Sequence, residues 1–332
     1  MTSTDTLLRL LTAPWLTRAV HAAVRAGVFD ELHTTPHTPA TLATTLGLHP
    51  DPLHRLLRTA ADLGLLHEHP DGTYTPTPTG ELLAADTPGS LRPLALFYDS
   101  EPLRRAWDHL DHTLHTATPA DEHAHGTAFY QHTATDPHHH ELFTAAMAAG
   151  STAAHALADT LDFTATRSIT DIGGGNGALL AALLDRHPHL TAVLLDLPHV
   201  LNTPHPALTP HLDTGRCTTA PGDFFTHIPA GSDTYLLCRV LHNWTDDQCH
   251  RILTHCRAAL GETGRLLIIE RVINPDTDPT LPLAFDMHMM AITGGRERTT
   301  AHYTALLHPH HLHLTAATPL PAGLTALTAT PH

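Results

Sequence analysis

Apolar and polar positions change their spacing near residue 168, and this change divides the predicted elements into two groups. Up to about residue 150, apolar residues recur at helical spacing, as in TLLRLLTAPWLTRAVHAAVRAGV over residues 6–28, where Gly27 is expected to end the helix. From residue 168 on, short apolar runs typical of buried strands alternate with helical segments. We therefore predict a helical N-terminal part and a doubly wound α/β sheet in the C-terminal part.

The segment after the first helix has the pattern of a winged helix. A short helix, a turn at Gly47 and a second helix over residues 51–63 precede two short apolar runs. The runs are joined at Pro70-Asp71-Gly72, which is typical of a hairpin turn. Residues 91–150 are predicted to be helical again, apart from a polar, glycine-containing loop over residues 116–127.

The C-terminal half contains the strands and helices of the predicted sheet. The strands are expected at 168–172, 191–196, 215–220, 234–238, 265–271, 312–318 and 324–329. The helices are expected at 177–187, 198–203, 246–260, 284–293 and 300–307. Because ligands of such sheets bind beyond the carboxyl ends of the strands, the residues that follow each strand are the first candidates for chemistry.

The composition narrows the classes of function. The chain of 332 residues has a formal charge of −15, which opposes unspecific binding to nucleic acid phosphates. Its apolar runs stay below the roughly 20 residues of a membrane span, and its first residues lack the pattern of a signal peptide. The four cysteines form no CxxC pair, so we expect reduced thiols in a cytoplasmic protein.

Histidine is frequent, with 33 residues, and some histidines are clustered in the sequence, at 138–140 and at 308–313. Such clusters suggest metal binding. Histidine is nevertheless scattered along the whole chain, often beside Pro or Thr, as a compositional bias would place it. The sequence therefore predicts no metal site.

The winged-helix pattern leaves a ligand-sensing transcription regulator as an alternative. Its recognition helix would be DPLHRLLRTAADLG, where Arg55 and Arg58 are the fixed cations and Asp51 and Asp62 lie beside them. A helix that contacts DNA is expected to have a basic face. The other interpretation is that this module packs against a second copy of the chain.

A glycine cluster follows the first strand of the C-terminal half, in SITDIGGGNGALLAALLDRHPHL. Gly173, Gly175 and Ala178 satisfy GxGxxA, and Asp196 lies near the distance expected for an acid that binds the ribose of NAD. Taken alone, these residues are therefore also compatible with a dinucleotide cofactor such as NAD.

The acids around the glycines favour a different cofactor. Asp171 directly precedes the cluster, where it would repel a pyrophosphate and attract an ammonium group. Asp223, after the third strand, is placed to bind an adenine amino group. S-adenosylmethionine, which has a sulfonium, an ammonium and no phosphate, suits this acidic edge.

Six segments occur in the order and spacing of a known family. They are DIGGGNG, LLDLPHV, PGDFF, LLCRVLHNWTDDQC, IIERVINPD and DMHMMAITGGRERT. With these motifs the chain resembles bacterial small-molecule O-methyltransferases of the caffeate O-methyltransferase-like group, over nearly its whole length. The resemblance implies a SAM-dependent enzyme that methylates an aromatic or polyketide-like natural product.

The resemblance also implies the organisation of the chain. Residues 1–95 are expected to form a winged-helix-like domain that makes a homodimer and does not bind DNA. Residues 96–150 would be a helical linker with substrate-pocket helices, and residues 151–332 a Rossmann-like, class I SAM-dependent methyltransferase domain. Neither a nucleic acid nor a membrane is expected as a partner.

Cofactor contacts follow from the matching motifs. Gly173 and Gly175 would approach the methionine part, Asp196 would bind the ribose hydroxyls, and Ser151 would reach the methionine carboxylate. The complete set implied for S-adenosylmethionine and its product S-adenosylhomocysteine is Ser151, Asp171, Gly173, Gly175, Asp196, Leu197, Asp223, Phe224 and Arg239.

The resemblance makes His242, in VLHNWTDDQC, the general base, flanked by Glu270 and Glu297. A phenol has a pKa of about 10, so little phenolate exists at neutral pH. A neutral imidazole can take the proton as the oxygen attacks the methyl group, and a carboxylate on the other ring nitrogen fixes the tautomer.

Two positions depart from plant relatives. Asn243 stands in place of an Asp, which weakens charge assistance to the base from this residue. Cys238 stands in place of a cofactor-binding Lys. Arg239 is then the nearest cation. Neither change removes the base.

The remaining expectations concern the acceptor. The substrate pocket is expected to contain Phe129, His132, Phe143, Met147, Asn243, His288 and Ile292. Phe143 and Met147, four residues apart, also fit ordinary core packing. Relatives that retain the cofactor but catalyse hydroxylation, decarboxylation or cyclisation form a further alternative, against which the retained His242, Glu270 and Glu297 favour methyl transfer.

Overall fold

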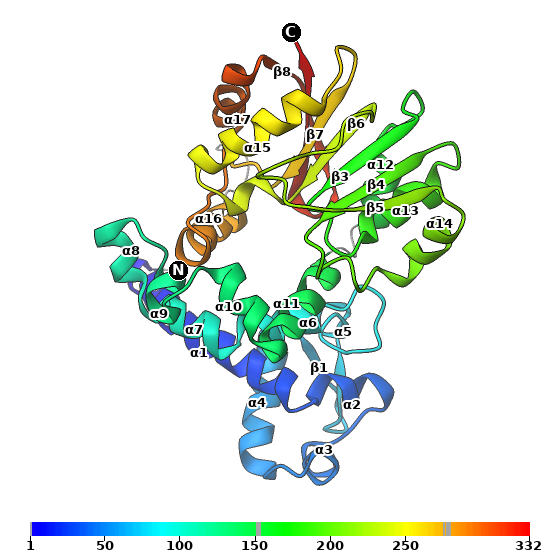
Figure 1. Cartoon of the computed structure of the whole chain (residues 1–332). Coiled ribbons are helices and arrows are strands. Elements are labelled where there is room, and N and C mark those ends of the chain that lie inside the picture. The colour runs from blue at the N-terminus through cyan, green and yellow to red at the C-terminus, as the bar shows by residue number, and fades with distance from the viewer. Residues whose placement is uncertain (1, 151–153, 275, 277–279) are drawn as a thin grey trace. The chain divides into compact units, whose positions relative to one another are not determined.

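A computed structural model describes residues 2–150, 154–274, 276 and 280–332 (Figure 1). The chain divides into two compact units, Met1–Arg104 with Thr133–Thr152 and Arg105–His132 with Ala153–His332. We call them the N-terminal unit and the sheet unit and describe each by itself. The segment 96–150, predicted as a linker, contributes to both units. The predicted boundaries 1–95, 96–150 and 151–332 remain a prediction.

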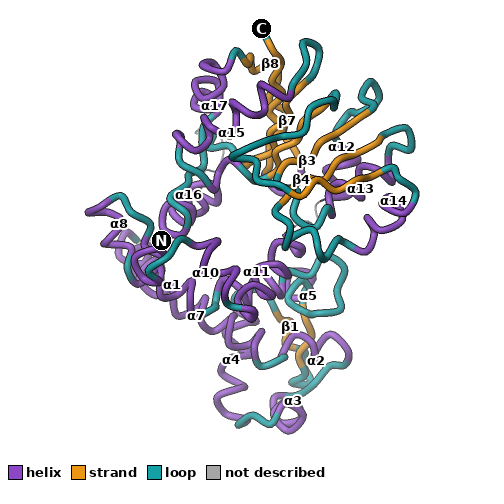
Figure 2. Tube along the Cα trace, in the orientation of Figure 1, coloured by secondary structure: helices purple, strands orange, loops and turns teal. Residues whose placement is uncertain are grey.

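The N-terminal unit is mainly helical (Figure 2). Its elements are α1 (Ser3–Arg25), α2 (Val28–Thr34), α3 (Pro39–Leu46), α4 (Pro50–Asp62), β1 (Leu66–Glu68), β2 (Tyr74–Pro76), α5 (Pro78–Glu81), α6 (Arg92–Tyr98) and α11 (Pro137–Gly150). The helix α7 (Glu101–Asp108) begins in this unit and ends in the sheet unit. The predicted helix–turn–helix and hairpin are therefore confirmed, with α3 and α4 followed by the antiparallel pair β1–β2.

Local sequence explains the ends of the first helices. Gly27 and Gly47 both have positive φ, at 75° and 66°, which costs glycine little, and each lies between two helices. Thr38 accepts a hydrogen bond from the backbone N–H of Thr41 and so caps the start of α3. The buried side chains of Phe29, Leu42 and others form a separate small core for this unit.

The sheet unit contains a seven-stranded sheet in the order β5-β4-β3-β6-β7-β9-β8. The strands are β3 (Ser168–Ile172), β4 (Thr191–Asp196), β5 (Cys217–Pro221), β6 (Thr234–Cys238), β7 (Arg265–Glu270), β8 (Leu312–Leu320) and β9 (Leu324–Pro331). β3 to β7 are parallel, whereas β9 runs antiparallel between β7 and β8. This is a doubly wound α/β sheet with two antiparallel pairs at one edge, and the doubly wound sheet was predicted. All seven predicted strands are present.

Helices cover both faces of this sheet, and each face has its own hydrophobic core. One core joins α12 (Ala154–Thr160) and α13 (Ala178–Arg186) to the sheet through residues such as Leu183 and Leu194. The other core joins α15 (Asp246–Ala259) and α17 (Thr300–Leu307) through residues such as Ile252 and Leu306. The unit also contains α8 (Leu110–Thr116), α9 (Ala120–His125), α10 (Phe129–Thr135), α14 (Thr209–Asp213) and α16 (Thr280–Ile292).

Two local predictions are wrong. Residues 198–203 form turns and bends instead of a helix, because Pro204 disfavours helical geometry at the preceding residue. The loop predicted over 116–127 contains α9, whose end is marked by Gly126 with φ 75°. Contacts with α8 and α16 stabilise α9, and these contacts are not visible in the local polarity of the segment.

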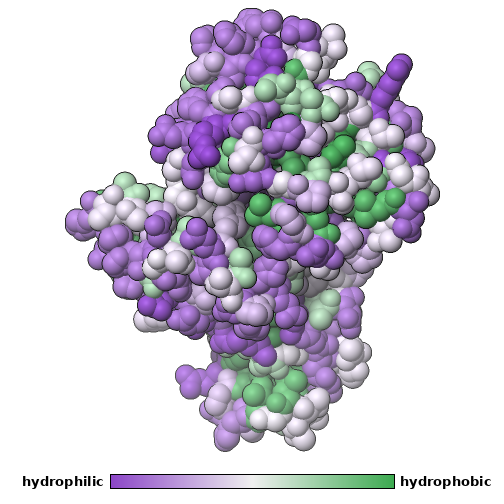
Figure 3. Space-filling model, viewed as in Figure 1, coloured by the Kyte–Doolittle hydropathy of each residue, from purple (hydrophilic) through white to green (hydrophobic). Residues whose placement is uncertain are grey.

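Hydrophilic residues cover most of the face shown in Figure 3. The helix α1, in contrast, exposes several large apolar side chains, of which Leu10 and Trp15 are 68% and 72% exposed. Among the helices that the structure describes, none is long and apolar enough to cross a membrane.

Candidate active site

The glycine cluster forms the turn between β3 and α13. Gly173 and Gly175 have φ values of 67° and 61°, so both positions favour glycine. A Cβ atom on Gly173 would lie 3.3 Å from Phe224 and 3.2 Å from Val240. A Cβ atom on Gly175 would meet nothing within 4 Å. The turn therefore packs on one side and presents backbone to open space on the other.

Asp171 is a buried carboxylate beneath this turn. Its Oδ1 accepts no hydrogen bond from any described residue, although the side chain is 1% exposed. Burial, and then the charge of Asp196, raise the pKa of Asp171 to about 7. A buried polar atom without a partner costs free energy, so this position suits a cationic group of a ligand.

The next strand ends are also acidic. Asp196, at the end of β4, accepts hydrogen bonds from the backbone N–H groups of Gly175 at 2.8 Å and of Leu197 at 2.7 Å. These bonds fix the carboxylate at the edge of the glycine turn. Asp223, beyond β5, accepts from the N–H of Phe225 at 2.8 Å, which places Phe224 against Gly173.

His242 lies beyond β6 in a short 3₁₀ turn and is buried. Its Nδ1 lies 2.9 Å from Glu297 Oε1, and its backbone N–H donates to Glu270 Oε1 at 3.2 Å. Glu270 is the last residue of β7, and Glu297 follows α16, so three separate segments meet here. Both carboxylates are buried, and burial raises the pKa of Glu270 to about 7. The structure thus brings the three predicted catalytic residues together.

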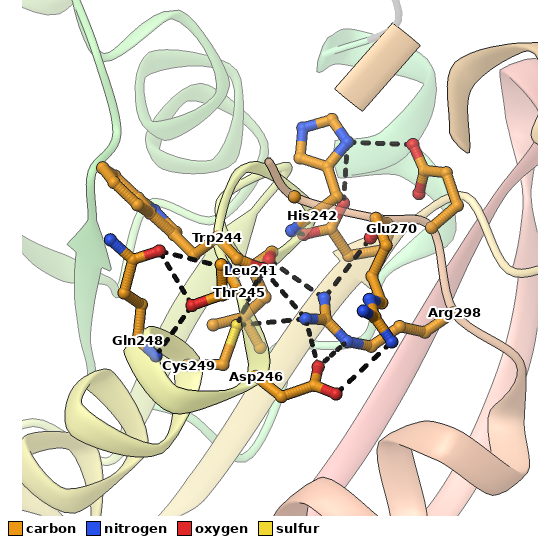
Figure 4. Close-up of polar contacts among 12 residues, drawn as sticks. Leu241, His242, Trp244, Thr245, Asp246, Gln248, Cys249, Glu270 and Arg298 are labelled. Atoms are coloured by element: carbon orange, nitrogen blue, oxygen red, sulfur yellow. Dashed lines mark hydrogen bonds and ion pairs between the residues drawn. The ribbon is translucent and has the colours of Figure 1, made fainter. Parts of the chain in front are cut away.

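Arg298 holds the turn that carries His242. Its guanidinium donates to the carbonyls of Leu241 and Trp244, both at 3.0 Å, and makes two bonds to Asp246 Oδ1. Figure 4 shows the guanidinium pointing toward these groups, whereas the His242 ring points away from it. Arg298 is 1% exposed, so this buried cation has its hydrogen-bonding partners inside the protein.

A close backbone approach completes this arrangement. A Cβ atom on Gly295 would lie 2.0 Å from the carbonyl oxygen of His242, so only glycine fits there. The N–H of Arg296 donates to the same carbonyl at 2.9 Å, and the N–H of Glu297 donates to Asp286 of α16 at 2.9 Å. The sequence interpretation missed Arg298, Asp246 and Asp286, although all three belong to the quoted motifs.

Four of the predicted substrate residues belong to the sheet unit and have defined surroundings there. Phe129 and Ile292 are buried, and His288 stacks on Trp107 with ring centroids 6.2 Å apart. Burial lowers the pKa of His288 to about 4, so its ring is neutral at pH 7. His132 bonds to Asp121 at 2.7 Å.

Three residues predicted to contact the substrate or the cofactor lie in the N-terminal unit or outside the described residues. Phe143, whose ring centroid is 5.6 Å from that of Phe97, and Met147 belong to the N-terminal unit, so their place in a substrate pocket remains a prediction. Ser151 lies outside the described residues.

The two departures from the plant pattern are Cys238, the last residue of β6, and Asn243, in the 3₁₀ turn that follows. Arg239 has a φ of 56°, an uncommon left-handed conformation for this residue type, and its N–H donates to Ile269 of β7. Asn243 donates to the carbonyl of Arg239 at 3.0 Å. Asn243 thus stabilises the left-handed turn that leads from β6 to His242. Burial raises the pKa of the Cys238 thiol, which keeps it uncharged.

Comparisons with known proteins identify the family. The model of the O-methyltransferase domain matches residues 107–311, and that of the O-methyltransferase dimerisation domain matches residues 4–86. The chain belongs to the O-methyltransferase family. The fold, the S-adenosylmethionine cofactor and the enzyme class expected from the motifs are confirmed, whereas the regulator and the non-methylating relatives gain no support.

Individual relatives cover almost the whole chain. The chain is 36% identical to a 3-amino-4-hydroxybenzoate 4-O-methyltransferase from Streptomyces cremeus, over 98% of this chain and 89% of that protein. It is similar to the structure of mitomycin 7-O-methyltransferase, with a TM-score of 0.88 and 35% identity over 99% of this chain and 98% of that chain. An O-methyltransferase from neocarzinostatin biosynthesis was solved with S-adenosylmethionine and 2-hydroxy-5-methyl naphthoic acid. This chain matches it with a TM-score of 0.77 and 31% identity, over 95% of this chain and 96% of that chain.

Proposed function

We propose that this O-methyltransferase transfers the methyl group of S-adenosylmethionine to a hydroxyl on an aromatic small molecule, with His242 as the general base. The observation that carries this proposal is the buried His242–Glu297 pair, at 2.9 Å. Because Nδ1 faces the carboxylate, Nε2 is the nitrogen left to accept a proton.

The residues at the strand ends fit the cofactor. Bound there, S-adenosylmethionine supplies an electrophilic methyl group on a sulfonium. Asp171 offers a buried oxygen without a hydrogen bond from the described residues, which suits an ammonium group, and the open side of Gly175 leaves room beside Asp196. The proposed cofactor contacts are Ser151, Asp171, Gly173, Gly175, Asp196, Leu197, Asp223, Phe224 and Arg239.

Proton transfer rests on the pair of carboxylates around His242. As the acceptor hydroxyl loses its proton to Nε2, the ring becomes positively charged and Glu297 stabilises it through the Nδ1 bond. Glu270 accepts the backbone N–H of His242 and so fixes the turn from which the ring projects. We assign Glu297 to orientation and charge stabilisation and Glu270 to positioning.

An aromatic acceptor suits the side chains near the base. Trp107 and His288 stack, and Tyr130 stacks on Trp244 with centroids 5.5 Å apart. The neutral His288 and the amide of Asn243 offer polar contacts to a second hydroxyl or carbonyl on the ring. Phe129 and Ile292 of the sheet unit complete the proposed apolar lining.

The test uses an acceptor that offers two nucleophiles. We incubate the protein with S-adenosylmethionine labelled in its methyl group and a set of aminophenols, and identify the methylated atom by mass spectrometry and NMR. We expect a label on oxygen. A label only on nitrogen, or no transfer to any aromatic hydroxyl while the cofactor binds, would contradict the proposal.

We also propose a cytoplasmic location. All four cysteines are free thiols, and three of them are buried, as is usual in a reducing compartment.

A further inference from the structure

A group of side chains of metal-ligating type lies on α9 and α10, far from His242 in the sequence. Asp121 and His125 are four residues apart on α9, so they share one face of the helix. His132 of α10 joins them, with Nε2 2.7 Å from Asp121 Oδ2. His125 Nε2 lies 3.7 Å from Asp121 Oδ1, and the two imidazole centroids are 4.5 Å apart. One donor atom from each residue lies within 4.8 Å of the others.

The carboxylate of Asp121 is short of partners for so buried a group. The side chain is 0% exposed, and its Oδ1 accepts no hydrogen bond from any residue that the structure describes. An ionised carboxylate at this depth needs a cation beside it.

The spacing of the donor atoms fits a small tetrahedral metal ion. Zinc–nitrogen and zinc–oxygen bonds of about 2.0–2.1 Å place two ligand atoms about 3.3 Å apart. His132 Nε2 lies 2.7 Å from Asp121 Oδ2 and His125 Nε2 lies 3.7 Å from Asp121 Oδ1, so the two contacts lie on either side of this value. Two imidazole nitrogens with one carboxylate oxygen favour zinc and similar transition metals over magnesium and calcium, which prefer oxygen ligands.

We propose that Asp121, His125 and His132 form a binding site for a divalent transition metal ion of the zinc class. Three protein ligands leave a fourth position for water or another donor. The ion would link α9 to α10, and α9 packs against α16, which carries His288. His132, predicted as a substrate contact, thereby becomes a metal ligand. This proposal is independent of the proposed function.

The neighbouring histidines provide the rival explanation. His112 and His123 stack with centroids 3.8 Å apart, and His109 lies 5.1 Å from His123. Because the chain has 33 histidines, weak nonspecific zinc binding is expected beside any specific site. The experiment must therefore detect only tight binding and must locate it.

The test titrates the chelator-stripped full chain with Zn²⁺ in competition with a chromophoric zinc indicator of submicromolar Kd. We expect one tight site per chain in the wild type. D121N, H125N and H132N should each weaken it at least about 100-fold, since each removes a direct ligand. H123N, on the exposed face of the same helix, is the matched control and should retain the site.

A spectroscopic measurement supports the location independently of folding effects. Co²⁺ in place of Zn²⁺ should give the intense visible absorption of a tetrahedral site in the wild type and in H123N, and not in H125N or H132N. Circular dichroism checks that each variant is folded. His125 and His132, whose side chains are 12% and 14% exposed, are less buried than Asp121 and keep the test valid if D121N unfolds. Absence of a tight site in the wild type, equal affinity in H125N and H132N, or loss only in H123N would overturn the proposal.

Discussion

At the residue scale, the most informative group is Asp171, a buried acid beneath the glycine turn. The unfolded chain has an ordinary Asp pKa near 4, whereas burial raises the folded value to about 7. The folded protein therefore binds the extra proton between these values. This contribution to stability is fully present below about pH 4 and is lost as the pH rises through 7.

We predict opposite effects of pH on stability and on cofactor binding. The ammonium of the cofactor favours ionised Asp171, so affinity for S-adenosylhomocysteine should rise about tenfold from pH 6 to pH 8. D171N should bind weakly at both pH values, and without cofactor it should melt at a higher temperature than the wild type at pH 8. Isothermal titration calorimetry measures the affinities, and thermal unfolding measures the melting temperatures. Equal wild-type affinity at pH 6 and pH 8 would refute the role of Asp171.

At the element scale, the turn between β6 and α15 depends on one buried cation. Arg298 binds two carbonyls of this turn and Asp246 at the start of α15, so it couples the position of His242 to a helix end. A lysine cannot make the same set of bonds, because it lacks the planar fork of donors.

We predict that R298K lowers both stability and turnover. The change removes hydrogen-bond donors from the carbonyls of Leu241 and Trp244, and each buried acceptor left without a donor costs about 1–3 kcal/mol. The turnover number should fall at least tenfold while the affinity for S-adenosylhomocysteine stays within about threefold. R296K is the matched control, since Arg296 is more than half exposed and lies 3.5 Å from the same Asp246. A full turnover number in R298K would show that the turn holds His242 without it.

Elements with strong periodicity were predictable, and elements made by distant contacts were not. The strands of the sheet follow apolar runs such as TAVLLD and RLLIIE, so each was found. The helix α9 was missed because Pro119, Gly126 and polar residues between them have the local pattern of a loop. Its formation depends on packing with the preceding helix α8 and with α16, which is distant in sequence.

The same distinction applies to the candidate site. Asp171 and Asp196 lie at the carboxyl ends of strands and His242 lies four residues after one, and topology predicts that such residues share one edge of the sheet. The bond from Arg298 to Leu241 spans 57 residues, and Trp107 meets His288 from another helix. No local pattern indicates such pairs, so only the folded structure reveals them.

At the scale of the whole molecule, the exposed apolar side chains of α1 indicate where the dimerisation domain meets its partner. They are Leu7, Leu8, Leu10, Leu11, Trp15 and Leu16. Such a group on one helix is unusual for a monomer and typical of an interface. We therefore place α1 in the homodimer interface.

We predict that charge on this face dissociates the dimer. The double variant Leu7→Glu and Leu11→Glu places two carboxylates one helical turn apart on exposed positions of α1. Light scattering at micromolar concentration should give the mass of a dimer for the wild type and of a monomer for the variant. Leu114→Glu, equally exposed but in the sheet unit, should remain a dimer. A monomeric wild type, or an intact dimer in the double variant, would place the interface elsewhere.

The chemistry of the whole enzyme rests on His242 as a base, and acceptors of graded acidity test this most directly. The measurement compares kcat/KM of the wild type and of H242A across a series of phenols whose pKa falls from about 10 to below the assay pH. Binding of S-adenosylhomocysteine serves as the check on folding. For the least acidic acceptor we expect a loss of roughly 10²–10⁴ in H242A. For acceptors that ionise in solution the loss should shrink to below about tenfold, because no base is then needed. Full activity of H242A toward the least acidic phenol, or the same loss across the whole series, would contradict the account.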